Sequence, residues 1–322
     1  MGAKEFIEHK LWELKSTDRK VENFSSKTEL KDFIFKTIMS KKFRKFSVTP
    51  VDYLVHIKGA IENSIEHDLP IKFIWPFGGY KLWRLKEAPE VDWAELFTLI
   101  YFAKWLKPIT DVYKPGVWFD FSSDDVIVER MNNIPKSDTE SYAKSFQMII
   151  DFLKSYLPEN FKFTMTPVSS YYTPEEFEED LKNKIEKMQT DLGGLPVLDD
   201  RSKRMVEMNV KLKPNQDTDP LWREKVELIH QSYYTVSRRR AYNRSKEKIL
   251  VFCTSMDNCV AVGTTKTSVA KFWPGAGGLR KTNESFIEYV LSPSQIEKQK
   301  FTWEPISIKG LSGKNFNQIR IF

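Results

Sequence analysis

Cysteine and histidine are scarce in this chain. The sequence has only two cysteines, Cys253 and Cys259, and four histidines, His9, His56, His67 and His230. The cysteines stand farther apart than a C-x-x-C metal or redox pair, and the histidines show no metal-ligand spacing. The sequence therefore predicts no metal site, and we expect two reduced structural thiols, with a disulfide across a hairpin as the alternative.

Long apolar runs and nucleotide-binding glycine motifs are also missing. No window approaches the roughly 18 consecutive apolar residues of a membrane-spanning helix. The segment "MGAKEFIEHK" lacks an apolar signal core, and Phe6 stands where a myristoylation motif needs Ser or Thr. "FWPGAGGL" lacks the GxGxxG order and "GTTKTS" lacks Walker spacing. These absences predict a cytoplasmic protein with no cofactor and no membrane partner.

What is present is an ordinary globular mixture with a modest excess of positive charge. The chain is 41% hydrophobic and 29% charged, with a formal net charge of +6, which is enough apolar content for a substantial core. Lysines alternate with glutamates, as in "EEFEEDLKNKIEKMQTDL", a pattern typical of a solvated helix face. This dispersion disfavours nucleic acid as a partner, whereas a positive field suits small anionic substrates.

Apolar strands and capped helices alternate in the first half of the chain. We predict strands over residues 71–77, 117–123 and 161–168, with helices that begin at Asp92 and near Thr139 between them. Such an alternation indicates a Rossmann-like α/β core with a mostly parallel sheet. Ligands collect at the carboxyl ends of the strands in sheets of this kind.

The rest of the chain changes character twice. Residues 1–170 are expected to hold the N-terminal helices and the Rossmann-like core, and residues 171–247 a charged helical connecting region. Residues 248–322 read mostly as strands, which predicts a C-terminal strand-rich α+β extension packed on the core. Within it, "SMDN" is expected to close an antiparallel hairpin.

The turn after the first expected strand ends in a lysine. In "IKFIWPFGGYK" the glycines Gly78 and Gly79 precede Lys81. Paired glycines let backbone N–H groups approach an anion, and an ammonium binds carboxylate or phosphate. We therefore expect Lys81 to be an exposed loop residue that pairs with an anionic substrate group and adds little stability. A plain surface lysine is the alternative.

Two further segments stand at expected strand exits. Asp92 is predicted as a helix N-cap with Glu95 completing a capping box, and this helix N-terminus could also face a ligand. In "FSSDDVIVE", Ser123 and Asp124 follow the second strand. A polar β-turn explains this segment, and metal binding by Asp124 and Asp125 is the alternative.

Arginines gather near residue 240. "SRRRAYNR" contains Arg238, Arg239, Arg240 and Arg244. Guanidinium groups bind oxyanions in a bidentate way, so the cluster is either a phosphate fork or a solvated charged face.

Four segments, taken in order, resemble the isocyanide (isonitrile) synthase family of the dityrosine and pyoverdine (paerucumarin) biosynthesis type. They are "WPFGGYK", "PEVDWAEL", "ITDVYKPGV" and "FSSDDVIVE", and "DTESYAKSFQMII" fits the family's next helix. The family has Ser-Asp-Gly where this chain has Ser-Asp-Asp, and its C-terminal arginine and histidine motifs find no match. The resemblance therefore indicates a divergent member.

The resemblance implies a Rossmann-like enzyme of secondary metabolism. Its substrates would be an L-amino acid and ribulose 5-phosphate, whose condensation, decarboxylation and fragmentation give an isonitrile with a carbon from the sugar. An iron/2-oxoglutarate oxygenase would be a pathway neighbour. The catalytic residues would be Lys81, Glu95 and Asp124.

The expected substrate-binding residues combine the family positions with the anion-binding candidates. They are Gly78, Gly79, Asp92, Ser123, Arg238, Arg239 and Arg240. Two other functions stay open: a transferase on the same scaffold that uses a phosphorylated or sugar donor, and a basic nucleic-acid-binding module.

Overall fold

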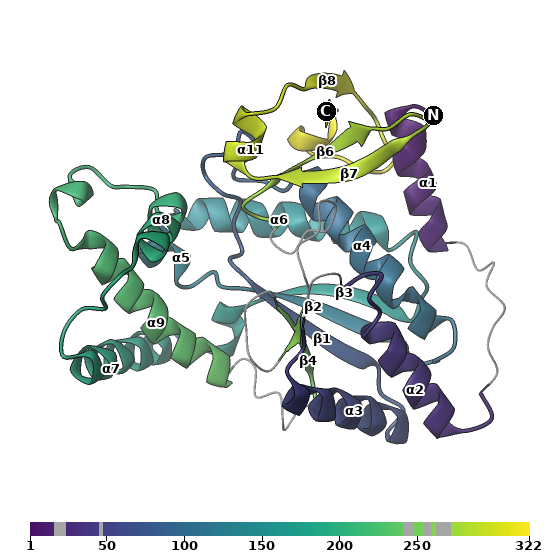
Figure 1. Cartoon of the computed structure of the whole chain (residues 1–322), viewed down its shortest axis with the longest axis horizontal. Coiled ribbons are helices and arrows are strands. Elements are labelled where there is room, and N and C mark those ends of the chain that lie inside the picture. Colours follow the sequence, from purple (N-terminus) through teal and green to yellow (C-terminus); the bar gives the residue numbers. More distant parts are fainter. Residues whose placement is uncertain (16–23, 45–47, 241–247, 254–258, 262–271) are drawn as a thin grey trace.

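A computed structural model describes residues 1–15, 24–44, 48–240, 248–253, 259–261 and 272–322 of the chain (Figure 1). Its α-helices are α1 (Ala3–Lys15), α2 (Lys27–Ile38), α3 (Val51–Glu66), α4 (Trp93–Thr110), α5 (Val128–Asn132), α6 (Lys136–Leu153), α7 (Pro174–Leu192), α8 (Asp200–Asn209), α9 (Trp222–Arg240) and α11 (Pro293–Glu297). Its strands are β1 (Ile71–Phe77), β2 (Val117–Ser123), β3 (Phe161–Pro167), β4 (Leu250–Cys253), β5 (Val260–Ala261), β6 (Ala276–Lys281), β7 (Phe286–Leu291), β8 (Thr302–Pro305) and β9 (Gln318–Ile321).

The first sheet is parallel throughout, in the order β3-β2-β1-β4-β5. β1 and β2 pair over their whole length, from Ile71 opposite Val117 to Phe77 opposite Ser123. The chain runs outward from β1 to β3 and then returns to the other side of β1 with β4, which is the strand order of a doubly wound Rossmann sheet. The predicted Rossmann-like core is confirmed.

An aromatic layer forms the core on one face of this sheet. Alternate residues of the strands point to that face, including Phe73, Phe77, Phe119 and Phe121, and all four are buried. Helices α4 and α6 cover this face, and α3 lies on the other side of the sheet (Figure 1). Helix α4 is buried around nearly its whole circumference, as expected of a helix enclosed between two sheets.

The second sheet is mixed and comes entirely from the C-terminal part of the chain, in the order β7-β6-β9-β8. It lies against α4 on the side away from the first sheet, with α1 at its edge (Figure 1). The predicted strand-rich extension is confirmed in this sheet.

The expected antiparallel hairpin at residues 250–261 is wrong. β4 and β5 pair in parallel, with Phe252 opposite Val260. The physical reason is that β4 also pairs in parallel with β1, and β5 extends the same sheet in the same direction. The turn "SMDN" itself lies at residues 255–258, outside the described residues.

Cys259 also departs from expectation, because it is disulfide-bonded. The parallel pairing places Cys253 opposite Ala261, so the segments that carry the two cysteines run side by side. The prediction of a reduced thiol is therefore wrong at Cys259.

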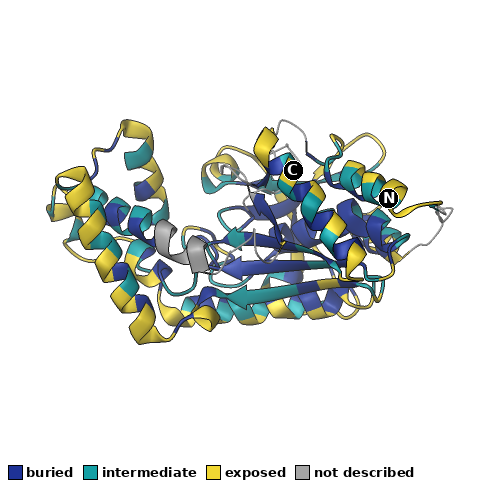
Figure 2. Cartoon of the chain, turned by 90° about the horizontal axis from the view of Figure 1, so that it is seen from below, coloured by how far each residue is buried: buried dark blue, intermediate teal, exposed yellow. Residues whose placement is uncertain are grey.

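Helices α7, α8 and α9 form an arm beside the carboxyl ends of the first sheet (Figure 1). Thr173 caps α7 with a capping box and Pro174 occupies its first turn, as the sequence predicts. Exposed residues dominate the outer faces of this arm (Figure 2). Within the described residues no helix combines the length and apolarity needed to cross a membrane.

The turn before β2 offers a test of the fold. Gly116 has φ +73°, and a Cβ there would lie 1.9 Å from the carbonyl oxygen of Asn160. Gly116→Ala is therefore expected to lower the free energy of unfolding by roughly 2–3 kcal/mol, because both backbone strain and a clash with main chain oppose it. Urea denaturation measures this change. Gly59→Ala, where a Cβ meets nothing within 4 Å, is the control and should not destabilise the protein.

Candidate active site

The candidate site begins where β1 ends, at the point where the strand order of the first sheet reverses. β1 lies between β2 and β4, which the chain reaches in opposite directions. Loops after the strands on either side of such a point diverge and leave a crevice for a ligand. The segment from Gly78 to Asp92 follows β1 and leads into α4, so the family-like residues stand at this point of the sheet.

The two glycines shape the exit from β1. Gly79 has φ +71°, and a Cβ there would lie only 2.5 Å from Cβ of Ser123. A side chain at Gly78 would meet the rings of Tyr80 and Trp273 at 3.0 and 3.3 Å. The first turn therefore packs its backbone directly on Ser123, and the two strand exits that carry the sequence resemblance are in contact.

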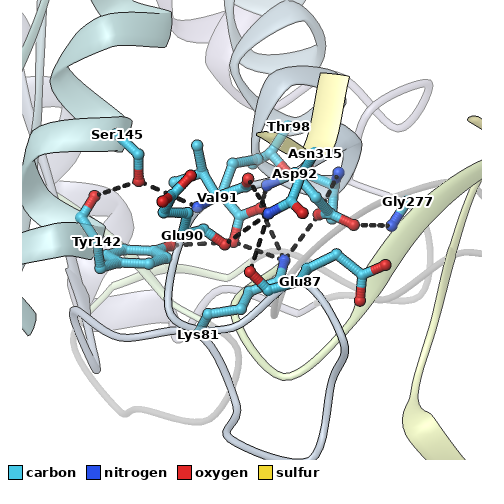
Figure 3. A network of polar contacts seen from close by, with 12 residues as sticks. Lys81, Glu87, Glu90, Val91, Asp92, Thr98, Tyr142, Ser145, Gly277 and Asn315 are labelled. Atoms are coloured by element: carbon cyan, nitrogen blue, oxygen red, sulfur yellow. Dashed lines mark hydrogen bonds and ion pairs between the residues drawn. The ribbon is translucent and has the colours of Figure 1, made fainter. Parts of the chain in front are cut away.

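Lys81 lies at the centre of a buried ionic cluster (Figure 3). Its Nζ donates to Asp92 Oδ1 at 2.7 Å, and to Glu95 Oε1 and Oε2 at 2.9 and 2.8 Å. The exposed fractions of the three side chains are 0%, 1% and 0%. The sequence prediction groups these three residues in one site, and the structure brings them together.

The expectation that Lys81 is an exposed loop residue is wrong. The C-terminal part of the chain covers the loop of residues 82–91. For example, Leu82 N of the loop donates to Trp273 O of the C-terminal part at 2.9 Å. All three ammonium hydrogens have acceptors within the chain, since a buried lysine is rarely left without paired anions. In this structure the three donors of Lys81 are all taken by Asp92 and Glu95, and its pairing with an anionic substrate stays a prediction.

Asp92 and Glu95 form the predicted capping box at the start of α4. Asp92 Oδ1 accepts from Ala94 N at 2.9 Å, and Glu95 Oε2 accepts from Asp92 N at 2.9 Å. Two more donors come from distant parts of the chain. Tyr142 OH donates to Glu95 Oε1 at 3.0 Å, and Gly277 N donates to Asp92 Oδ2 at 2.8 Å.

One lysine cannot neutralise two buried carboxylates, and this sets the protonation of the cluster. Burial raises the pKa of Glu95 to about 8, with Lys81 opposing the rise and the neighbouring Asp92 adding to it. Burial also acts on Asp92, but Lys81 and the hydrogen bonds from its neighbours hold its pKa below the ordinary value. Near neutral pH the cluster thus contains a charged Lys81, a charged Asp92 and a Glu95 that carries a proton. Such a group is suited to general acid–base work.

The second strand exit carries Ser122, Ser123 and Asp124. Asp124 N donates to Phe77 O at 2.9 Å, and Asp124 Oδ1 accepts from Tyr233 OH at 2.7 Å. Ser122 and Ser123 are buried, and Ser122 Oγ has no hydrogen-bond partner within the described residues. Helix α9 thus reaches the carboxyl edge of the sheet through Tyr233.

The predicted arginine fork is not placed. Arg238, Arg239 and Arg240 belong to the last turn of α9, but their side chains, and the whole of Arg244, lie outside the described part of the chain. Their contact with a phosphate therefore stays a prediction.

Three residues of the site were not predicted from the sequence. Tyr142 stands in an amphipathic helix, where a buried tyrosine usually reports only packing. Tyr233 likewise sits on a helix face without any motif. Gly277 belongs to "FWPGAGGL", whose closely spaced glycines were the one sequence signal of a close backbone approach.

Comparison with solved structures identifies a protein of similar fold. The chain is similar to the crystal structure of the PvcA protein from Pseudomonas aeruginosa, with a TM-score of 0.60 and 14% identity, over 91% of this chain and 99% of that chain. Tyrosyl-tRNA synthetase from Aeropyrum pernix matches at a TM-score of 0.32 and 11% identity over 84% and 71% of the two chains, a score too low to indicate a shared fold. No family model and no curated protein matches the sequence. The first likeness shows that this chain has the PvcA fold.

Proposed function

We propose that this protein is an isocyanide-synthase-like enzyme that converts an L-amino acid and ribulose 5-phosphate into an isonitrile. The observation that carries the proposal is the convergence of the family-like segments. Lys81 and its partners Asp92 and Glu95 come from two of these segments and form one cluster, and Gly79 packs on Ser123 from another. The segments that carry the resemblance thus place their charged and polar residues together at the carboxyl edge of the sheet, which supports a common site.

The fold gives independent support to the proposal. PvcA is an isonitrile synthase of paerucumarin biosynthesis, and nearly its whole length superposes on this chain. The shared fold extends to the C-terminal half, where the sequence carries none of the family's arginine and histidine motifs.

The geometry refines the roles proposed for the residues. Glu95, which is fully buried, would hold a proton behind the substrate, and the less buried Asp124 at the strand exit would be the carboxylate that contacts the sugar carbonyl. Lys81 acts through Glu95 and Asp92 as a positioning residue, because its three donors are occupied. Gly78, Gly79, Ser123 and the arginines of α9 would bind the substrate.

A labelling experiment tests the reaction. We expect the purified protein, incubated with single L-amino acids and uniformly ¹³C-labelled ribulose 5-phosphate, to release an isonitrile with one labelled carbon, detected by mass spectrometry. Asp124→Asn, which removes the carboxylate but keeps the size of the side chain, should reduce turnover roughly a hundredfold or more.

A control variant and a negative result complete the experiment. Asp151→Asn removes an exposed carboxylate whose partners, Gln147 and Lys154, lie on the surface at the end of α6, and it should leave turnover unchanged. Absence of label transfer with every proteinogenic amino acid would reject the reaction. In that case, label transfer from phosphorylated sugar to another acceptor would support the alternative transferase.

A further inference from the structure

The C-terminal part of the chain holds much of the loop that carries the cluster, and Ser145 and Glu207 add further hydrogen bonds to it. Between β1 and α4, residues 78–92 pair with no strand. Asn315 Nδ2 donates to the carbonyl oxygens of Glu87 and Val91 at 2.9 and 3.0 Å. Arg320 on β9 forms an ion pair with Glu87, and both side chains are nearly fully buried. These contacts fix the backbone on both sides of the turn that leads to Asp92.

Gly277 makes the closest of these approaches. Its N–H reaches Asp92 Oδ2 at 2.8 Å, and a Cβ at this position would lie 2.4 Å from Ala94 N and 2.5 Å from the carbonyl carbon of Trp93. Position 277 therefore has no room for a side chain, because β6 lies directly on the first turn of α4. A glycine inside a strand often marks such an approach of one backbone to another.

From these contacts we infer that Gly277 and Asn315 are positioning residues of the site: the C-terminal sheet holds Asp92 against Lys81 and thereby aligns Glu95. Gly277 supplies an N–H to the one carboxylate oxygen that Lys81 does not contact. Asn315 holds the loop that precedes Asp92. The link to catalysis rests on the proposed function, but the positioning itself is measurable without turnover.

The same contacts bear on how the cluster ionises. The charged and titratable groups that face Glu95 are Lys81 from the loop, Asp92 from α4 and Tyr142 from α6. β6 adds only the N–H of Gly277, which lowers the pKa of Asp92. Loss of that donor makes the anionic cluster less stable, so the proton held by Glu95 should be released at higher pH.

Gly277→Ala is the first test. A Cβ would push β6 away from α4 and break the bond to Asp92, so we expect the carboxyl titration of the cluster, followed by ¹³C NMR of labelled glutamate, to move to higher pH. Gly59→Ala is the matched control because its added methyl group has open space. An unchanged titration in a folded Gly277→Ala protein would overturn the role of Gly277.

Asn315→Ala is the second test. It removes atoms and therefore introduces no steric clash, unlike Gly277→Ala. Loss of the side-chain amide should raise amide hydrogen exchange in residues 82–92 at least tenfold, while Asn317→Ala, which removes the exposed asparagine two residues on, should leave it unchanged. Equal exchange in both variants would overturn the role of Asn315.

Measurements of turnover test the positioning role of Gly277 and Asn315 separately from the proposed reaction. If the wild type makes isonitrile, both site variants should lose roughly tenfold to a hundredfold in kcat with little change in KM, as expected for misalignment of groups that act behind the substrate. A change confined to KM would overturn the assignment. A wild type without isonitrile activity rejects the proposed function, while the titration and exchange results still decide the positioning.

Discussion

Lys81→Ala is expected to lower the free energy of unfolding by roughly 3–5 kcal/mol and to abolish turnover. The substitution removes the cation between two buried carboxylates, so Asp92 and Glu95 are left without the ammonium to which both are bonded. Near neutral pH Asp92 must then take up a proton or remain a buried, unpaired anion, and both outcomes are costly. Guanidinium denaturation monitored by circular dichroism measures the change in stability.

The partners of Lys81 allow a sharper version of this experiment. Replacing all three ionisable side chains, in Lys81→Met with Asp92→Asn and Glu95→Gln, should recover a large part of the lost stability, because no uncompensated charge remains buried. It should not recover turnover. Lys154→Ala, which breaks only an exposed ion pair with Asp151, should cost at most about 1 kcal/mol. If Lys81→Ala were as stable as Lys154→Ala, the buried cluster would not exist in solution.

Stability is expected to fall as pH rises from about 5 to about 8, by up to roughly 4 kcal/mol. The pKa of Glu95 is raised from 4.5 to about 8 in the folded protein. Between these two pKa values the folded state binds a proton that the unfolded chain has released. The contribution of Glu95 to the free energy of unfolding is therefore full below pH 4.5 and is lost as the pH rises through about 8. Asp92, whose pKa is lowered, acts in the opposite sense and only at acid pH.

Glu95→Gln isolates this contribution from all other titrating groups. Glutamine resembles the protonated glutamic acid in shape and cannot ionise, so the variant should lose the fall in stability that Glu95 produces. Urea denaturation of the two proteins at half-unit steps between pH 5 and pH 9 gives the difference curve. Parallel pH profiles for the wild type and the variant would show that Glu95 does not carry a raised pKa.

Local sequence was sufficient for the elements that hold the site. "IKFIWPF" and "VWFDFSS" carry their apolar residues in strand-like runs, and both became central parallel strands in full register. The capping box from Asp92 to Glu95 was predicted because it joins residues three apart, and its hydrogen bonds form as expected. The sequence resemblance also grouped Lys81 with these two carboxylates.

Tertiary structure decided what those residues do. Nothing near Lys81 in the chain indicates its burial, because the cover comes from residues more than 180 positions later, such as Gly277. The local sequence likewise gives no sign that Tyr142 donates a hydrogen bond to Glu95, which lies 47 residues earlier in the chain. β4 entered the first sheet beside β1 although its flanking sequence reads as a hairpin. Periodicity and capping report interactions within a turn or a strand, whereas burial, ion pairing and raised pKa values depend on which distant segment excludes water from a side chain.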